Sequence, residues 1–347
     1  MSCQWLWAMA EFVANRSPTG IAPVLQMHPT RRCNLACAHC YSLSGPTERE
    51  ELRPEVLSAC LEDAAGLGYR QLAVSGGEPL LYGPLAEILS CARGLGMITT
   101  ITSNGMLLTG RRWAPLAALV DVLAISIDGT PLEHDQIRRR EGAFAQTVAN
   151  LEVVRSSGVP FGIIFTLTQH NVDSLEFVVR LAAEHGARGV QVHPLTLQGR
   201  AATALPGARP DGIELAAALF EASRLREKYG LNIHVDALTA RQLIEYRGHM
   251  VPDRPVRKLT DAAPTLVVEA NGTVLPLTHE INRGLTLGSL DDARLSSLAR
   301  NWLDAGHGDI LAEACERTWT ELTAAGPYDA VYWYDEVAAR TNALVAA

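Results

Sequence analysis

Three cysteines lie close together near the start of the chain, in the segment MHPTRRCNLACAHCYSLS that covers residues 27–44. Cys33, Cys37 and Cys40 have the spacing C-x3-C-x2-C, directly after an apolar run that predicts a buried strand. Thiolates are ligands that zinc and iron–sulfur clusters select. Three thiolates on one short loop therefore predict a single inorganic centre that has one protein ligand fewer than usual.

The missing fourth ligand separates the kinds of centre that this loop could hold. Structural zinc takes four ligands, and a [4Fe–4S] cluster in an electron carrier takes four cysteines. Three cysteines around such a cluster leave one iron open, so that a substrate or cofactor can bind it directly. A zinc or iron–sulfur binding module without catalysis remains the alternative from a different class.

With Tyr41 directly after the last cysteine, the loop resembles that of the radical S-adenosylmethionine (SAM) superfamily. The resemblance implies that the SAM amino and carboxylate groups bind the open iron of one [4Fe–4S] cluster. An electron from the cluster then cleaves SAM to methionine and a 5′-deoxyadenosyl radical, which abstracts a substrate hydrogen. A reductant such as flavodoxin or ferredoxin is implied. By the same resemblance, His39 lies on the adenine side of the SAM site rather than on the metal.

After the cysteine loop, short apolar runs alternate with helical patterns. The runs cover residues 22–27, 71–74, 97–102, 122–127, 161–167 and 189–193, and the helices cover residues 54–64, 85–95, 113–119, 143–155, 175–184 and 213–228. Strands that alternate with helices predict a parallel α/β sheet. Six such units are too few for a closed eight-unit barrel. The resemblance implies the open (βα)6 partial TIM barrel of radical SAM enzymes.

Polar residues follow the second, third and fourth predicted strands, at the barrel edge where functional loops gather. The second strand ends in Ser-Gly-Gly-Glu-Pro, residues 75–79. Its glycines let the backbone approach a ligand closely, and a carboxylate can accept from an ammonium group. The resemblance assigns the SAM contacts to these strand ends, and the residues concerned are Gly76, Gly77, Glu78, Ser103, Asn104, Ser126 and Asp128.

The fifth and sixth strands offer candidates for the substrate. Thr166 lies in the fifth strand, His193 ends the sixth, and Arg200 belongs to a Gly-Arg pair that is common after this strand in relatives that modify peptides or build cofactors. His279 and Glu280 are further candidates in the C-terminal third. A capping, salt-bridged or surface-turn role is the alternative for each of them.

The C-terminal third departs from the barrel pattern. Two apolar runs joined by Asn271-Gly272 predict a β-hairpin. This segment resembles the α+β extension of SPASM or twitch-type radical SAM enzymes, but Leu277 stands where those proteins place a cysteine, and Cys315 is the one cysteine of this third. We therefore expect a twitch-like extension without an auxiliary cluster. Without a second electron acceptor, a redox-neutral change such as epimerisation is expected more often than oxidative cross-linking.

These patterns divide the chain into an N-terminal helix (1–21), the partial barrel (22–230) and the extension (231–347). A net charge of −8 without a basic run argues against nucleic-acid binding. The chain has no apolar run of membrane-spanning length, and residues 4–13 are too short and lack the basic flank for a secretion signal. Four scattered cysteines besides the loop suit a reducing cytoplasm.

The substrate stays open at this level. The resemblance to peptide-maturing and haem- or quinone-cofactor enzymes favours a ribosomally made peptide, and a small metabolite or cofactor precursor is the alternative. A transferase that uses a second SAM is a weaker hypothesis, because the chain shows no cobalamin domain and no extra cysteine pair.

Overall fold

The computed structural model describes residues 22–324 and 330–345, and the predicted N-terminal helix falls outside these ranges. One ten-stranded sheet organises the described chain, in the order β11-β10-β9-β1-β2-β3-β4-β5-β6-β7. Its strands are β1 (Val24–Met27), β2 (Gln71–Val74), β3 (Ile98–Ser103), β4 (Val122–Ser126), β5 (Phe161–Leu167), β6 (Gly189–Pro194), β7 (Asn232–Val235), β9 (Thr265–Val268), β10 (Thr273–Pro276) and β11 (Gly288–Ser289). All neighbours from β9 through β1 to β7 are parallel.

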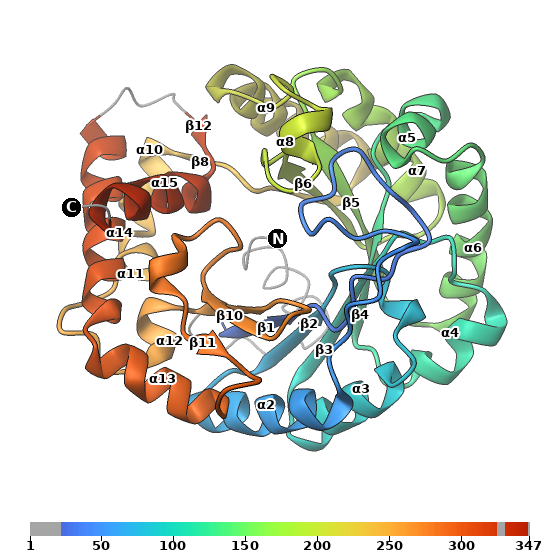
Figure 1. Cartoon of the computed structure of the whole chain (residues 1–347). Coiled ribbons are helices and arrows are strands. Elements are labelled where there is room, and N and C mark those ends of the chain that lie inside the picture. The colour runs from blue at the N-terminus through green and yellow to red at the C-terminus, as the bar shows by residue number, and fades with distance from the viewer. Residues whose placement is uncertain (1–21, 325–329, 346–347) are drawn as a thin grey trace.

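Helices cover the outside of the curved sheet, and the sheet does not close on itself within the described residues (Figure 1). They are α2 (Pro54–Leu67), α3 (Leu85–Gly94), α4 (Gly110–Ala117), α5 (Pro131–Arg138), α6 (Ala143–Ser157), α7 (Leu175–Glu184), α8 (Ala201–Ala204) and α9 (Gly212–Tyr229). Buried strands whose side chains pack on both faces explain why the sequence runs are apolar rather than alternating. The predicted open partial barrel is confirmed.

Helix α5, the short helix α8 and strand β7 are barrel elements that were not predicted. Helix α5 follows β4 directly, and β7 pairs with β6 and extends the parallel sheet beyond residue 231. Thr130 and Glu133 form a capping box and Pro131 occupies the first turn, so the sequence did carry a start signal for α5. Strand β7 is only four residues long and begins soon after the glycine that ends α9, which made its apolar pattern too short to recognise.

The C-terminal third completes the sheet at its other edge. The predicted hairpin is present as β9 and β10, and β9 pairs in parallel with β1, so that Leu266 lies beside Leu25. A pair of short strands, β8 (Leu238–Thr239) and β12 (Ala330–Val331), and the helices α10 (Ala240–Glu245), α11 (Arg247–Met250), α12 (Leu259–Ala262), α13 (Leu295–Asp304), α14 (His307–Ala324) and α15 (Trp333–Val345) complete this part.

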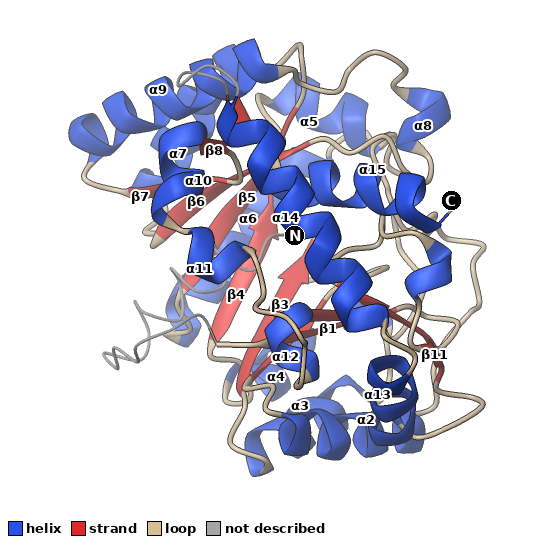
Figure 2. Ribbon diagram, turned by 90° about the vertical axis from the view of Figure 1, so that its left-hand side faces the viewer, coloured by secondary structure: helices blue, strands red, loops and turns tan. Residues whose placement is uncertain are grey.

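Packing joins the C-terminal third to the barrel. Helix α13 packs against α2 (Figure 2). Buried side chains of both parts belong to one continuous hydrophobic core. The predicted domain boundary at residue 230 therefore remains a prediction. The residues on its two sides share one sheet and one hydrophobic core. Within the described residues, no helix has both the length and the apolar character that a membrane span requires.

Because β9 lies between β1 and β10, we predict that the barrel and the C-terminal third unfold together. Leu266 is fully buried, and Leu266→Ala should lower the free energy of unfolding by about 2–5 kcal/mol. Urea titrations followed by far-ultraviolet circular dichroism and by tryptophan emission should shift together. Ile213→Ala is the matched control, since Ile213 is 76% exposed and its loss should cost within about 0.5 kcal/mol. Two separate transitions, of which only one moves, would contradict the shared core.

Candidate functional site

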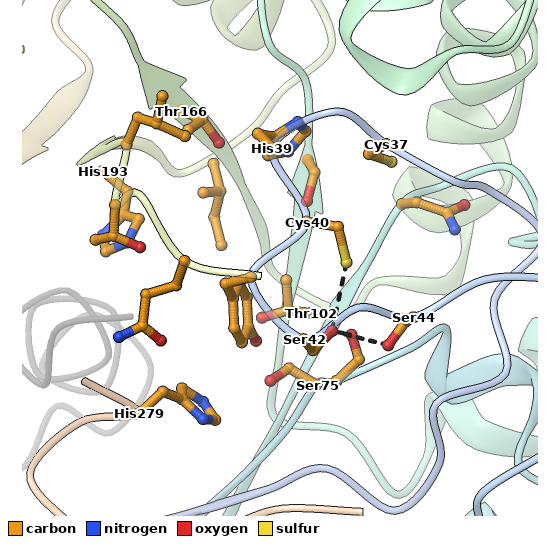
Figure 3. Close-up of a pocket in the computed structure, with 18 of the residues that line it drawn as sticks. Cys37, His39, Cys40, Ser42, Ser44, Ser75, Thr102, Thr166, His193 and His279 are labelled. Atoms are coloured by element: carbon orange, nitrogen blue, oxygen red, sulfur yellow. Dashed lines mark hydrogen bonds between the residues drawn. The ribbon is translucent and has the colours of Figure 1, made fainter. Parts of the chain in front are cut away.

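A cavity of about 150 Å³ lies where the carboxyl ends of the barrel strands meet the cysteine loop. Fourteen of the seventeen residues that the sequence predicted for the site line it: Cys33, Cys37, His39, Cys40, Tyr41, Gly76, Gly77, Ser103, Asn104, Ser126, Thr166, His193, His279 and Glu280. Figure 3 shows Cys37 and Cys40 on one side of this cavity and His193 and His279 on the other. The structure thus brings the cluster, SAM and substrate candidates into one space.

Each of the three thiols has a polar donor nearby. Asn104 Nδ2 lies 3.8 Å from Cys33 Sγ, Arg138 Nη1 lies 3.9 Å from Cys37 Sγ, and Ser42 Oγ lies 3.5 Å from Cys40 Sγ. Such donors stabilise thiolates and tune the potential of a bound iron–sulfur cluster. Asn104 follows β3 and Arg138 ends helix α5, so the barrel supplies these donors to the loop.

The donor set fits a [4Fe–4S] cluster better than a single metal ion. Among the described residues, no three His, Cys, Asp or Glu side chains converge on one ion position. A cubane cluster presents a separate iron to each thiolate, so its ligands need not converge. Burial raises the pKa of Cys33 to about 12, which means that a thiolate there requires a neighbouring positive centre.

The cysteine loop is clamped from the β6 side by Gly199 and Arg200. Arg200 donates through Nε to the Cys37 carbonyl (2.9 Å) and through Nη2 to the Ser44 carbonyl (2.5 Å). A side chain on Gly199 would collide with the carbonyl oxygens of Cys40 and Tyr41, so only glycine permits this contact. The prediction that Arg200 faces the substrate was therefore wrong, because its guanidinium holds the backbone of the loop.

The Gly-Gly turn after β2 approaches the same loop. A Cβ on Gly77 would collide with the Arg32 carbonyl oxygen, and the Gly77 N–H donates to the Thr30 carbonyl (2.9 Å). The sequence pattern indicated close approach to a ligand. The structure shows that the close approach is to the cysteine loop itself, while Gly76 and Gly77 still line the cavity.

Glu78 does not line the cavity and its carboxylate is fully buried. It accepts hydrogen bonds from Ser103 Oγ (2.9 Å), the Asn104 N–H (2.9 Å) and the Leu80 N–H (3.2 Å). Burial raises its pKa, against the opposing effect of these donors. A direct bond from Glu78 to the SAM ammonium is therefore a prediction that this geometry contradicts. The carboxylate instead ties the β2 turn to the end of β3.

Asp128 is likewise buried behind the cavity wall. Arg138 donates to its Oδ2 through Nε at 2.6 Å, and the Thr166 N–H donates to Oδ1 at 3.2 Å. Burial alone would raise the pKa of Asp128, but the guanidinium and the nearby imidazoles lower it below its usual range. The predicted contact of Asp128 with SAM is not supported, because this carboxylate positions Arg138 beside Cys37.

His193 and His279 line the cavity, and each is backed by a carboxylate. His193 Nδ1 lies 2.8 Å from Asp236 Oδ2, and His279 Nδ1 lies 3.4 Å from Glu269 Oε1. Burial lowers the pKa of His193 and of His279 despite these carboxylates. Each carboxylate fixes the orientation of its imidazole, and with it the nitrogen that faces the substrate side.

Tyr41 belongs to an aromatic group that joins the cysteine loop to the C-terminal third. Its hydroxyl lies 3.3 Å from His28 Nε2, and its ring centroid lies 4.9 Å from that of His279. His28 and His279 stack with centroids 4.5 Å apart. His39 also lines the cavity, 3.8 Å from Asp128, and burial lowers its pKa to about 4, so its ring is neutral.

Sequence reasoning missed Arg138, Asp236 and Tyr332. The capping signal of α5 could have revealed Arg138 as a helix residue next to the site. Asp236 directly follows β7, much as Asp128 follows β4. Recognition of β7 in the sequence would have indicated Asp236 as a candidate. Tyr332 lines the cavity from the short segment before α15, and no local signal in the sequence indicates its position.

Comparison with known proteins agrees with this geometry. Residues 27–182 match the Radical SAM superfamily. The chain is 32% identical over 180 residues to the Fe-coproporphyrin III synthase of Methanosarcina barkeri, covering 51% of this chain and 45% of that protein. It is 30% identical over 273 residues to the PqqA peptide cyclase of Methylocella silvestris, covering 74% of this chain and 69% of that protein.

The chain spans about half the length of several curated relatives that it matches, among them the Fe-coproporphyrin III synthase. Among solved structures, Streptococcus suis SuiB bound to its precursor peptide SuiA superposes with a TM-score of 0.63 at 16% identity, covering 88% of this chain and 68% of SuiB. That likeness establishes the fold. Together with the superfamily match and the extended identity to the peptide cyclase, it shows that this chain belongs to the radical SAM superfamily of enzymes.

Proposed function

We propose that this enzyme cleaves SAM reductively at one [4Fe–4S] cluster held by Cys33, Cys37 and Cys40 and abstracts hydrogen from a ribosomally made peptide. The observation that carries the proposal is the single cavity in which three donor-supported thiols face the polar ends of β2 to β6. A thiol loop without these strand ends would be consistent with a metal-binding module. The combination supports catalysis on a bound cofactor and substrate.

When bound, the cluster supplies the electron that cleaves SAM to methionine and the 5′-deoxyadenosyl radical. The chain's own part is to hold the thiolates, to orient SAM and to exclude water. Asn104, Arg138 and Ser42 stabilise the thiolates. The exposed backbone of Gly76 and Gly77, with the hydroxyl of Ser126, offers the polar groups that SAM requires.

We propose that the chain holds this one cluster only. The other cysteines in the described residues are Cys60 in α2, Cys91 in α3 and Cys315 in α14, and none of them lines the cavity. A substrate radical then has no second cluster to receive its electron. This supports a redox-neutral outcome, such as epimerisation or rearrangement, over oxidative cross-linking.

The peptide assignment rests on the relatives. One extended match is named a PqqA peptide cyclase, and the SuiB structure contains a precursor peptide. The match to an Fe-coproporphyrin III synthase favours the second candidate, a small cofactor precursor as substrate. For either substrate, a flavodoxin- or ferredoxin-type reductant would supply the electron.

Replacing Cys33, Cys37 or Cys40 by Ala should remove the iron–sulfur chromophore and all SAM cleavage, because loss of one thiolate leaves an iron without its protein ligand. Anaerobic reconstitution followed by iron, sulfide and absorbance analysis measures this, with about four irons expected per wild-type chain. Cys60→Ala, Cys91→Ala and Cys315→Ala are the controls and should keep the chromophore. A requirement for Cys315 in iron binding would refute the single-cluster proposal.

Glu78→Gln should lower the free energy of unfolding by about 1–3 kcal/mol. Three donors now hydrogen bond to the buried Glu78 carboxylate, and the NH2 group of the new amide would face one of these donors without an acceptor. Urea denaturation measures the change. Glu87→Gln, an exposed charge change on α3, should have no comparable effect. If stability is unchanged and SAM binding is weaker, the result would instead support a direct contact between Glu78 and SAM.

The reaction itself has a direct readout. With dithionite and SAM, the protein should release 5′-deoxyadenosine slowly, and faster when the substrate is added. A short peptide encoded beside the gene, prepared with deuterium, should transfer the label into the 5′ position, measured by mass spectrometry. Absence of 5′-deoxyadenosine under every reducing condition would refute the enzyme proposal. A product two hydrogens poorer than the peptide, formed without an added acceptor, would refute the redox-neutral preference.

A further inference from the structure

A second cavity of about 450 Å³ adjoins the site on the side of the C-terminal third. Pro194 at the end of β6 and Tyr332 before α15 line both cavities, so the two spaces share a wall. The second cavity is bounded by α9, α10, α14 and α15. It therefore lies beside the substrate end of the site, on the far side from the cysteine loop.

Two carboxyl groups meet at the shared wall. Glu280 lines the first cavity and Asp335 lines the second, and the two side chains are close enough to hydrogen bond when one of them carries a proton. Asp335 is 92% buried as a side chain, and its Oδ2 lies 3.0 Å from Arg209 Nη2. Burial and the neighbouring Glu280 raise the pKa of Asp335 to about 9, so at neutral pH Asp335 carries a proton that it can donate to Glu280. Apart from this proton, its buried Oδ1 has no hydrogen-bond donor, and a cationic ligand could take the place of the proton.

The surroundings of this pair are negative. Burial raises the pKa of Tyr332, and the charges of Asp236, Asp335 and Glu280 raise it further. The Tyr332 ring packs edge-on against His193, with centroids 5.5 Å apart, so the carboxylates lie next to the substrate side of the first cavity. Carboxylates and an aromatic ring together attract an organic cation.

The positive charge that lines the second cavity does not offset this negative charge. Arg209 contributes one positive charge to the lining, which also contains the carboxyl groups of Asp211, Asp335 and Glu336. Arg209 is 48% exposed and contacts Oδ2 of Asp335, so no arginine is bonded to Oδ1. Glu336 is paired with Arg340 at 2.9 Å, so the unsatisfied acceptor is at Asp335 and not at Glu336.

We infer that Glu280 and Asp335, with the ring of Tyr332, bind a primary ammonium group of the substrate at the passage between the two cavities. The ammonium donates to Asp335 Oδ1 and to Glu280, and the rest of the molecule extends toward His193 and the SAM site. This inference rests on the proposed peptide substrate, where the ammonium is either a lysine side chain or the N-terminal amine. The inference therefore requires that the substrate carry a positively charged ammonium group.

Binding of three small probes to the reconstituted, unreduced holoenzyme with saturating SAM tests the inference. N-acetyl-lysine amide carries a side-chain ammonium, norleucine amide carries an α-ammonium, and N-acetyl-norleucine amide carries none. Calorimetric titration should show binding of one or both cationic probes and not of the neutral probe, and the better cation identifies the source of the ammonium. Equal binding of the neutral probe, or no binding of either cation, would overturn the inference.

Glu280→Gln is the decisive variant, because its amide can donate to Asp335 Oδ1 and so replaces the ligand's donor without leaving a cavity. The affinity for the cationic probe should fall about tenfold or more, while thermal stability and SAM affinity stay at or above wild type. Asp335→Asn provides a second variant if the first fails to fold. Glu336→Gln makes the same charge change in the second cavity, beside Asp335, and should alter affinity less than about twofold.

Equal losses in Glu280→Gln and Glu336→Gln would mean that only bulk charge matters, and unchanged affinity in Glu280→Gln and Asp335→Asn would mean that the pair binds no ammonium; either result overturns the inference. The probe titrations need no electron and no SAM cleavage. A protein that binds the cation but never forms 5′-deoxyadenosine would therefore refute the proposed reaction while leaving the ammonium site intact.

Discussion

The site depends on how closely the cysteine loop can approach the strand ends that surround it. Gly77 on one side and Gly199 on the other contact backbone carbonyls of the loop at places where any Cβ would collide. With the loop at that distance, the Gly77 and Arg200 N–H groups donate to loop carbonyls, and the Arg200 guanidinium reaches two more. A loop that supplies only three ligands gains its rigidity from this packing and does not need a fourth ligand to close it.

The buried charges serve the same arrangement. Asp128 holds Arg138 through a short ion pair inside the wall, and Arg138 in turn lies beside the Cys37 thiol. A buried pair of this kind adds little net stability, but loss of one partner leaves an isolated buried charge at a cost of about 3–5 kcal/mol. The ion pair therefore serves to position Arg138. The positive charge of Arg138 can lie next to the Cys37 thiolate because the Asp128 carboxylate stabilises it there.

The parts of the fold that the sequence predicted are those with strong local patterns. The six strands of the barrel and the Asn271-Gly272 hairpin are present, because apolar runs and turn residues specify them without help from distant contacts. The pairing of β9 with β1 could not be predicted, since it joins segments about 240 residues apart through backbone hydrogen bonds that carry no sequence signature. The same limit applies to Tyr332, which enters the site from a remote part of the chain.

The strand ends that the sequence predicted for the site line one cavity, but the sequence did not predict which of their side chains face that cavity. A pattern such as Gly-Gly-Glu-Pro places a carboxylate at a strand terminus and does not say whether it points to solvent or into the wall. Glu78 and Asp128 both point into the wall, where backbone N–H groups and Arg138 satisfy their oxygens. Polar residues at such an edge therefore include a set that faces the ligand and a set that holds the first set in place.

The turn after β10 begins with Leu277, which stands where the SPASM or twitch resemblance predicts a cysteine. Leu277 has a φ of 62°, a left-handed conformation that costs a leucine about 1–2 kcal/mol. Its side chain is buried, and its N–H donates to the Thr265 carbonyl of β9, so packing and a sheet hydrogen bond offset the strain. The turn directs Thr278, His279 and Glu280 into the cavity. The sheet therefore maintains a strained turn, and this turn presents three polar side chains to the cavity.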